Sequence, residues 1–286
     1  MRIITLLQKI AATSTRCSTA RSTKATAFTA TNNTIRLLST TISPSTCQLC
    51  KSSSISHLLT ENDPHLNLNS TALPVSIHYH RCNDCCYVFQ DEHSRLTPDN
   101  EKIRYNEHNN DPNDSRYRKF LLPLANAVVP FLKPNAIGLD FGCGPGPTLS
   151  LLMEEKGFVC KNYDPFFYPN LPDHDPDNDN DSDERHSMKY DYILSSEVFE
   201  HLHDPRKELK YLNSLLTKNG VLGIMTSRVN GDVDGELFQS WWYRRDPTHV
   251  GFFARESFIK VRDEFFPNAS VEFPSKSITV IRKNEM

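Results

Sequence analysis

The sequence contains no aspartate or glutamate before Glu61. Seven lysines and arginines precede that residue, so with a net charge of −3 for the whole chain the remainder carries −10. An acidic body is a poor electrostatic partner for phosphate backbones, which proteins bind through lysine and arginine. Nucleic acid is therefore disfavoured as a ligand, although a local basic patch remains compatible with this composition.

Long hydrophobic runs are also missing, because no apolar stretch approaches the ~20 residues that a membrane-spanning helix needs. We therefore expect no membrane span. The first 45 residues instead contain mainly Ser, Thr and Ala with several Arg, a composition typical of transit peptides. We expect residues 1–45 to be a disordered mitochondrial transit peptide, with a plastid as the alternative destination. A merely disordered tail is the competing interpretation.

The eight cysteines do not have the spacing of a disulfide framework. Four of them form two Cys-x-x-Cys pairs, and such pairwise clustering fits tetrahedral metal ligation better. We expect residues 46–98 to form a zinc-ribbon-like domain. Its structural zinc would be held by four thiolates, those of Cys47, Cys50, Cys82 and Cys85. Cys86 in place of Cys85, His80 as a ligand, and reduced cysteines without metal are the open alternatives.

Glycine is scarce, with ten residues in the chain. Four of the ten fall within nine positions, which indicates a place where the backbone approaches a ligand closely; these are Gly138, Gly142, Gly144 and Gly146. An apolar strand at 136–141 precedes the turn, and a helix at 149–157 and a strand at 158–164 follow it. This βαβ unit predicts an α/β fold with a mostly parallel sheet.

The alternation of strands and helices resumes after residues 172–186, an acidic insertion without apolar residues that cannot join a core. The flanking pattern predicts a helix that begins at 113–115 and is kinked by Pro123 and Pro130, strands at 190–195 and 221–227, helices at 203–220 and 255–266, and an antiparallel edge hairpin of 271–273 and 278–283. In the helix at 203–220, Asp204 should be the N-cap and Asn219-Gly220 should form the end.

Two acids stand at the ends of the first two strands of the βαβ unit. Asp140 directly precedes the glycine turn, and Asp164 follows the next strand, 22 residues after Gly142. Glycine turns at the carboxyl end of a strand lie at the crevice where open α/β sheets bind ligands. An acid in the place of Asp164 can accept hydrogen bonds from both hydroxyls of a ribose.

Three segments in this order, GLDFGCGPGP, NYDPFF and YDYILSSEVFEHLHDP, resemble the class I S-adenosylmethionine-dependent methyltransferases, in particular the type 11, 12 and 23 branches. The resemblance covers about residues 99–286. It implies a Rossmann-like, doubly wound sheet that uses S-adenosylmethionine to methylate an acceptor. The family's third strand and its adenine-binding acid are not recognisable, because the acidic insertion stands in their place.

The resemblance also implies roles for particular residues. The methionine end of the cofactor would be held by Asp140 and by Gly142, Gly144 and Gly146. Asp164 would hold the ribose, and Ser196 and Glu197 would border the site of methyl transfer. A sulfonium methyl donor is already reactive, so the enzyme mainly positions the acceptor and removes its proton.

The segment WWYRRDPTHVGFF resembles a loop that lies near the substrate in several of these enzymes. His249 in this loop is the expected general base together with Glu197, with a purely structural histidine as the alternative. Two further sets stay open: an aromatic wall of Trp241, Trp242 and Tyr243, and a metal cluster drawn from Glu197, Glu200, His201 and His203. Tyr105 and His108 are weaker candidates for closing over the cofactor.

The sequence therefore predicts a methyltransferase with a structural zinc and a small-molecule acceptor. Two other functions remain compatible with it. One is an organellar RNA methyltransferase that uses the ribbon for RNA, and the other is a catalytically silent protein whose ribbon binds a partner. The acceptor atom and the oligomeric state do not follow from the sequence.

Overall fold

The computed structural model describes residues 44–63, 75–106, 110–170 and 189–284. Nearly all of the predicted transit peptide, the acidic insertion at 172–186 and His108 lie outside these ranges. In the described part of the chain, no helix is long and apolar enough to cross a membrane.

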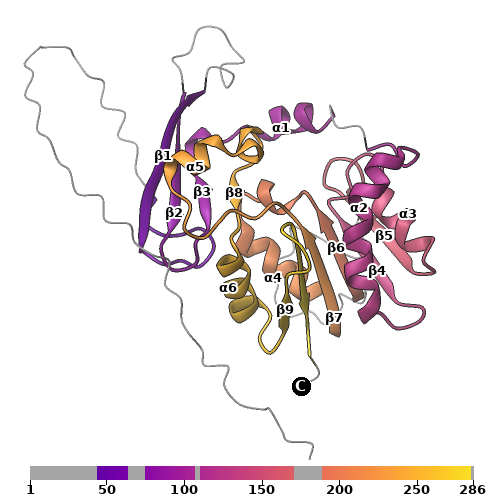
Figure 1. The fold of residues 1–286 in the computed structure, drawn as a ribbon. Helices are drawn as coiled ribbons and strands as arrows, with labels where there is room; N and C mark the ends of the chain where they lie inside the picture. The colour runs from indigo at the N-terminus through magenta and orange to yellow at the C-terminus, as the bar shows by residue number, and fades with distance from the viewer. Residues whose placement is uncertain (1–43, 64–74, 107–109, 171–188, 285–286) are drawn as a thin grey trace, which may run out of the picture.

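A six-stranded sheet forms the larger part of the molecule (Figure 1). Its order is β5-β4-β6-β7-β10-β9, with β5, β4, β6 and β7 parallel and with β10 antiparallel to both of its neighbours. The strands are β4 (Ile137–Phe141), β5 (Val159–Tyr163), β6 (Tyr190–Ser196), β7 (Leu216–Met225), β9 (Ser270–Glu272) and β10 (Ile278–Arg282). This topology confirms the predicted Rossmann-like fold, including the antiparallel hairpin at one edge.

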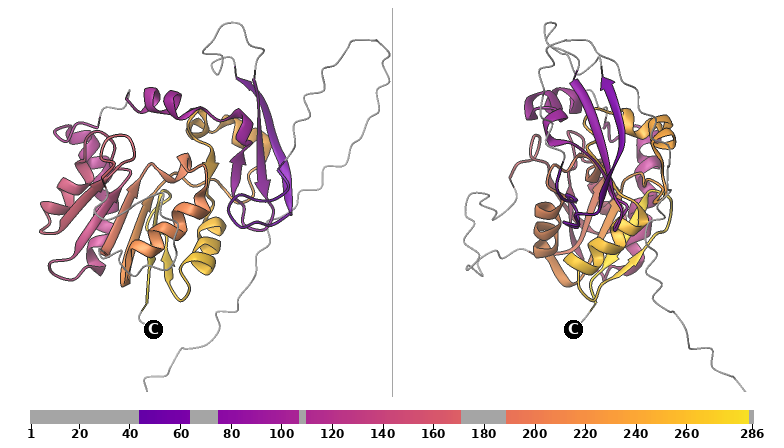
Figure 2. Two further views of the ribbon diagram at one scale, coloured as in Figure 1. Left: turned by 180° about the vertical axis from the view of Figure 1, so that it is seen from behind. Right: turned by 90° about the vertical axis from the view of Figure 1, so that its left-hand side faces the viewer.

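Helices cover both faces of this sheet (Figure 2). One face packs against α2 (Ser115–Val128) and α3 (Thr148–Glu154), and the other packs against α4 (Pro205–Leu215) and α6 (Arg255–Phe265). The side chain of Asp114 accepts from the N–H of Arg116 and caps α2, and the side chain of Asp204 caps α4 in the same way. Asp204 is the predicted cap, and Asp114 lies within the predicted start of its helix at 113–115.

The predicted helix at 203–220 was too long at its end. α4 stops at Leu215, and β7 begins at Leu216, which is buried and pairs with Tyr190. Asn219 and Gly220 lie inside the strand, where the register against β6 shifts. Because the burial of Leu216 against the sheet is a tertiary effect, the Asn-Gly signal for a helix end did not reveal it.

A second, four-stranded sheet carries the cysteine pairs (Figure 1). Its order is β1 (Ile55–Asp63), β2 (Val75–Cys82), β3 (Val88–Gln90) and β8 (Gly251–Phe252), all antiparallel. The last of these strands comes from the predicted aromatic loop, where Gly251 pairs with Phe89 and Phe252 with Val88. The small sheet is thus completed by the carboxyl-terminal part of the chain.

The two sheets also share a hydrophobic core. One buried cluster contains Cys47, Cys82 and Tyr87 from the small sheet region together with Phe253, which precedes α6, and Phe258 of α6. The remaining helices are α1 (Pro98–Tyr105) and α5 (Gly235–Ser240), and short 3-10 helices are η2 (Glu92–Ser94), η3 (Val129–Phe131), η4 (Phe199–His201) and η5 (Trp242–Arg245).

Candidate active site

A cleft of about 850 Å³ opens at the carboxyl ends of β4, β5 and β6. Asp140, the glycine turn and Asp164 line one end of it, and Glu197, His201, Tyr243 and His249 line the other. We call these the glycine-turn end and the acid–histidine end. Predicted site residues that stand more than a hundred positions apart therefore share one cleft, at the edge where parallel α/β sheets bind ligands.

The glycine-turn end is held by the carboxylate of Asp164. Its Oδ2 accepts from the N–H of Gly144 at 3.0 Å, and its Oδ1 accepts from the N–H groups of Phe166 at 2.9 Å and Phe167 at 3.1 Å. Gly142 and Gly144 have φ values of +80° and +65°, a region that favours glycine. Asp164 therefore ties the turn after β4 to the turn after β5, and Oδ2, which accepts one N–H against two on Oδ1, keeps lone-pair capacity for a ligand.

The glycines make room for protein atoms as well as for a ligand. A Cβ on Gly142 would lie 2.4 Å from Cγ2 of Val198, and a Cβ on Gly146 would lie 2.1 Å from the carbonyl oxygen of Asn110. Gly146 does not line the cleft, whereas Gly142 and Gly144 do. Gly146 therefore packs against the chain ahead of α2, and its predicted cofactor contact stays a prediction.

Asp140 is 2% exposed at the end of β4. Burial raises the pKa of its carboxyl to about 7, although a hydrogen bond from the backbone of Ser150 acts in the opposite direction. The negative charge of Asp164 adds to the increase. Asp140 is therefore a buried acid, and a cationic group bound in the cleft would stabilise its ionised form.

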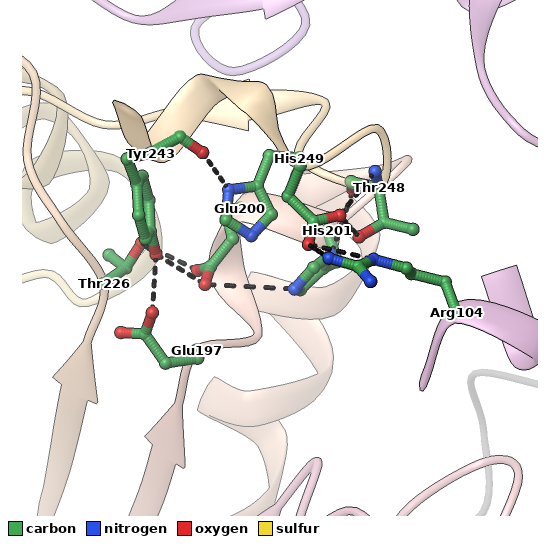
Figure 3. A network of polar contacts seen from close by, with 9 residues as sticks. Arg104, Glu197, Glu200, His201, Thr226, Tyr243, Thr248 and His249 are labelled. Carbon is green, nitrogen blue, oxygen red and sulfur yellow. Dashed lines mark hydrogen bonds and ion pairs between the residues drawn. The ribbon is translucent and has the colours of Figure 1, made fainter. Parts of the chain in front are cut away.

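The acid–histidine end is a connected network around the hydroxyl of Tyr243 (Figure 3). This oxygen lies 2.5 Å from Oε1 of Glu200 and 3.1 Å from Oε2 of Glu197. Thr226 donates to Oε2 of Glu200 at 2.7 Å. Because a tyrosine has one hydroxyl hydrogen, it can donate to only one of the two carboxyl groups, so the other contact is a hydrogen bond only when that acid carries a proton.

Protonation of one acid agrees with the burial of both. Burial, followed by the charge of Glu200, raises the pKa of Glu197 to about 8. Burial also raises the pKa of Glu200, which is 0% exposed. Glu197 has a φ of +53°, which is uncommon for a residue with a side chain. Its carboxyl group thus sits at the end of β6 with a pKa close to neutrality, the range that suits acid–base catalysis.

Both histidines of this end are oriented by backbone carbonyl groups. His249 Nδ1 lies 2.6 Å from the carbonyl oxygen of Tyr243, and His201 Nδ1 lies 2.9 Å from the carbonyl oxygen of Thr248. A carbonyl oxygen only accepts, so each Nδ1 carries the hydrogen and each Nε2 of a neutral ring is an acceptor. Burial lowers the pKa of His249, which favours that neutral ring.

Asp246 holds the loop that carries His249. It accepts from the N–H of Thr248 at 3.0 Å and from its hydroxyl at 2.6 Å, and Arg104 of α1 donates to it at 3.0 Å. Burial alone would raise the pKa of Asp246, but these hydrogen bonds outweigh it and hold the pKa well below its usual range. The loop is therefore fixed at both ends before any ligand is bound.

The predicted aromatic residues divide between core and cleft. Trp241 packs against Phe238 and Phe252 beside the small sheet, whereas Trp242 lines the cleft and is 67% exposed. Tyr105 also lines the cleft, and its ring meets His201 edge-on at 5.3 Å. Ser196, at the end of β6, lines the cleft between its two ends.

Four thiols converge at the base of the small sheet, and all their Sγ atoms lie within 4.8 Å of one another; they are Cys47, Cys50, Cys82 and Cys85. Cys47 and Cys85 are 3.7 Å apart, and Cys50 and Cys82 are 3.5 Å apart. With Zn–S bonds of about 2.3 Å, the edges of a ZnS₄ tetrahedron measure about 3.8 Å. The predicted four cysteines thus form a group that fits a tetrahedral metal ion.

The two alternative ligands lie elsewhere. Cys86 is not in the group of four thiols, and His80 Nε2 lies 2.7 Å from Oδ1 of Asp91. The alternative metal cluster was partly wrong as well. His203 pairs with Glu101 at 2.7 Å, and the residues that do converge are Glu200, His201 and His249.

Several residues that line the cleft or support its side chains were missed by the sequence reasoning. Thr226 follows the last residue of β7, so its place at the carboxyl end of a parallel strand was a usable signal. Asn110 contacts the glycine turn and Arg104 contacts Asp246, yet both lie in polar segments that carry no recognisable motif. Such long-range contacts become visible only in the folded chain.

The fold and the cleft together define a class I methyltransferase, and comparison with known proteins agrees. A family model described as a methyltransferase domain matches residues 107–265, which is more than half of the chain. The chain therefore belongs to the class I S-adenosylmethionine-dependent methyltransferase family. A search of curated proteins finds no matching relative.

Solved structures with a similar fold include several bacterial proteins. The YcgJ protein of Bacillus subtilis is 15% identical, with 54% of this chain and 70% of that one covered and a TM-score of 0.38. The 1,6-didemethyltoxoflavin-N1-methyltransferase of Burkholderia thailandensis, solved with 1,6-didemethyltoxoflavin and S-adenosylhomocysteine, is 13% identical, with 71% and 97% covered and a TM-score of 0.43. A TehB-like methyltransferase of Corynebacterium glutamicum is 14% identical, with 67% and 98% covered and a TM-score of 0.34.

Proposed function

We propose that this chain transfers the methyl group of S-adenosylmethionine to a small-molecule acceptor. The cofactor would occupy the glycine-turn end of the cleft, and the acceptor would occupy the acid–histidine end. The observation that carries this proposal is the presence of both ends in one cleft, at the carboxyl edge of the parallel strands. The two ends offer different chemistry, one suited to a nucleoside with a cationic tail and the other to proton transfer.

The residues of the glycine-turn end fit the proposed cofactor. Asp140 is buried without a cationic partner among the described residues, and its carboxylate would pair with the amino group at the methionine end. Asp164 keeps lone-pair capacity on Oδ2 for a ribose hydroxyl. Gly142 and Gly144 bring the backbone to the cleft wall, and Ser196 would lie near the methyl group.

When bound, S-adenosylmethionine supplies an activated methyl group on a sulfonium centre. The chain would then align the acceptor and take up its proton. Glu197, with a pKa of about 8, and His249, with a free Nε2, are the proposed acid–base residues. Tyr243 contacts both Glu197 and Glu200, so it would pass changes in charge between the two carboxyl groups.

The size and charge of the cleft favour a small acceptor. Its volume of about 850 Å³ lies within the range of small-molecule sites, which is roughly 300–1,000 Å³. Six acids but only two arginines are among the described residues that line it; these are Glu101, Asp140, Asp164, Glu197, Glu208 and Asp246 against Arg104 and Arg245. With pKa values of about 7 and about 8, Asp140 and Glu197 are partly protonated at neutral pH, but the other four acids still outnumber the two arginines. This excess favours a sulfonium over a phosphate backbone.

Calorimetry with S-adenosylmethionine tests the cofactor. Asp164→Ala should weaken its binding by about 1.5 to 3 kcal/mol, the scale of lost hydrogen bonds to a charged group. Asp232→Ala, an exposed aspartate away from the cleft lining, is the matched control. Absence of binding to the unmutated chain would point to the catalytically silent alternative.

Methyl transfer from labelled cofactor tests the acceptor. We expect label in the small-metabolite fraction of a cell extract and none in purified organellar RNA. Transfer to RNA alone would instead assign the chain as an RNA methyltransferase. The Glu197→Gln variant should bind cofactor normally and lose transfer, because the amide cannot accept the proton.

The four thiols are proposed to hold one structural zinc ion, on the strength of their spacing and mutual distances. Closed sites of four thiolates have no open position for catalysis, so the metal would stabilise the fold. Elemental analysis of the chain purified without chelator should find about one equivalent of zinc. Less than about half an equivalent would contradict the assignment.

Residues 1–45 are proposed to direct the protein to mitochondria, on their composition alone. Fusion of this segment to a fluorescent reporter tests the proposal. A mitochondrial signal is expected, a diffuse cytosolic signal would refute it, and a plastid signal would change the destination.

A further inference from the structure

Two imidazole rings at the acid–histidine end lie beside the carboxyl group of Glu200. His201 Nε2 lies 3.9 Å from Oε1 of Glu200, and the donor atoms of Glu200, His201 and His249 all lie within 4.8 Å of one another. Each Nδ1 is already bound to a backbone carbonyl oxygen. The three remaining donor atoms therefore converge on one small volume (Figure 3).

Glu200 lacks a permanent cation. Its two carboxyl oxygens accept from the neutral hydroxyls of Tyr243 and Thr226, and in the described part of the chain the only ion-pair partner within reach is His201. The side chain of Glu200 is 0% exposed. A buried carboxylate in such surroundings is stabilised by a charged ligand.

We infer that Glu200, His201 and His249 bind a divalent transition-metal ion at the acid–histidine end of the cleft. Metal–nitrogen and metal–oxygen bonds of about 2.0–2.2 Å place neighbouring donor atoms about 3 to 3.5 Å apart. His201 Nε2 and Glu200 Oε1 are 3.9 Å apart, and no two donor atoms of the group are more than 4.8 Å apart, so the side chains must close by up to roughly one ångström. Rotation of the Glu200 carboxyl and the two rings supplies a movement of that size.

The three side chains make the additional hydrogen bonds that metal ligands usually make to neighbouring protein groups. Metal-binding imidazoles usually donate their other N–H to a carbonyl or carboxylate group, as His201 and His249 do here. Ligating carboxylates are in turn hydrogen-bonded, as Glu200 is by Tyr243 and Thr226. These contacts would keep the three donor groups on the same side of the cleft before the ion arrives.

The donor set selects the class of ion. Two imidazoles and one carboxylate suit zinc, iron, cobalt or manganese, whereas magnesium prefers oxygen ligands only. His201 and His249 line the cleft, so the remaining coordination positions face the proposed acceptor. That last point rests on the proposed function. With His249 on the metal, proton uptake falls to Glu197, which is not one of the three converging donors.

Titration with Co²⁺ tests this inference on the full chain that already carries zinc in its four-thiol site. Thiolates hold zinc more tightly than cobalt, so added Co²⁺ reports on the second site. We expect one saturable equivalent of Co²⁺ with visible ligand-field bands and without the intense thiolate-to-cobalt charge-transfer band. A charge-transfer band as the only signal would overturn the inference, as would the absence of saturable binding.

Variants assign the site. Glu200→Gln, His201→Ala and His249→Ala should each weaken Co²⁺ binding by about tenfold or more. His203→Ala is the matched control, because His203 follows the same short helix but pairs with Glu101 outside the converging group. Equal Co²⁺ affinity in the His201, His249 and unmutated proteins would overturn the assignment.

Two further measurements separate this inference from other failures. Calorimetry with S-adenosylmethionine on the same variants shows whether the glycine-turn end is intact. Thermal unfolding without added metal shows whether the variant is folded. Weaker Co²⁺ binding with unchanged cofactor binding supports the metal site, whereas lost cofactor binding in the unmutated chain counts against the proposed function alone.

Discussion

The two ends of the cleft are built in opposite ways. The glycine-turn end comes from residues 140–146 and 164–167, and much of its structure is backbone held by Asp164. The acid–histidine end consists of side chains from η4, the end of β7, η5 and the loop that follows it. A site made of backbone groups is encoded by a short motif. A site made of side chains from distant segments depends on the tertiary contacts that hold those segments in place.

The small sheet, which carries the four thiols, holds the acid–histidine end in place through backbone hydrogen bonds. The N–H of Val250 donates to the carbonyl oxygen of Glu200 at 2.8 Å, and the N–H of Gln90 donates to the carbonyl oxygen of Val250 at 2.9 Å. Val250, next to His249, is thus hydrogen-bonded to η4 on one side and to β3 on the other. The small sheet therefore supports the acid–histidine end and is more than an appended module.

Loss of the four-thiol metal site should have the largest effect and should separate the two ends. Cys82→Ser removes one ligand, and structural zinc contributes several kcal/mol or more to folding. Since β3 and β8 pair directly, we expect acceptor methylation to fall by about hundredfold, or about 2.8 kcal/mol. Cofactor affinity should change by less than about threefold.

Cys160→Ser provides the control for that experiment. Cys160 is a buried thiol of β5 outside the group of four, so the substitution buries a hydroxyl without removing a metal ligand. Methylation and zinc content should both stay close to those of the unmutated chain. Unchanged methylation in a zinc-free Cys82→Ser protein would show that the small sheet does not brace the acceptor site.

A methyl group added to the glycine turn should weaken binding at the glycine-turn end, in contrast to the loss of zinc. Gly142→Ala places a Cβ 2.4 Å from Val198 at a φ of +80°. Gly157→Ala has a similar φ of +87° but no atom within 4 Å of the new Cβ. Both should lose about 1 kcal/mol of stability from the left-handed backbone. Only Gly142→Ala should also weaken S-adenosylmethionine binding, by about tenfold or more in calorimetry; equal affinities would contradict it.

The same contrast explains what the sequence could predict. Asp140, the glycine spacing and the caps at Asp114 and Asp204 act within a few residues, so local chemistry identified them. The pairing of Gly251 with Phe89 joins residues more than 150 positions apart, and no local pattern encodes it. Sequence reasoning found His249 through a motif, but the convergence of Glu200 and His201 on it follows from tertiary packing.

The buried acid of the glycine-turn end predicts a pH dependence. Asp140 has a pKa of about 7 in the folded chain, against about 3.9 when unfolded. Between these values the folded form holds a proton that the unfolded form has lost, so stability falls as the pH rises. Urea unfolding from pH 5 to 7 should show an extra slope of up to about 1.4 kcal/mol per pH unit that Asp140→Asn removes.

Two comparisons sharpen that measurement. Asp191→Asn, at an exposed carboxylate of β6, should leave the slope unchanged. Saturating S-adenosylmethionine should flatten the slope of the unmutated chain, because a cationic amino group stabilises ionised Asp140. An identical slope in Asp140→Asn and the unmutated chain would mean that Asp140 is ionised throughout this range.

The smallest effect is expected at the rim of the acid–histidine end, where Arg104 contacts Asp246. The two side chains are 38% and 17% exposed, and ion pairs of this kind contribute about 0.2 to 1 kcal/mol. Asp246 keeps its hydrogen bonds from Thr248 without Arg104, so the loop stays in place. Arg104→Gln should therefore raise the KM for the acceptor by about two- to fivefold, with cofactor affinity unchanged.

Arg116→Gln provides the control. It removes an exposed pair with Asp114, neither of which lines the cleft, and should change neither quantity. A loss of methylation in Arg104→Gln as large as that in Cys82→Ser would show that α1, and not the small sheet, is the principal brace of the acceptor site.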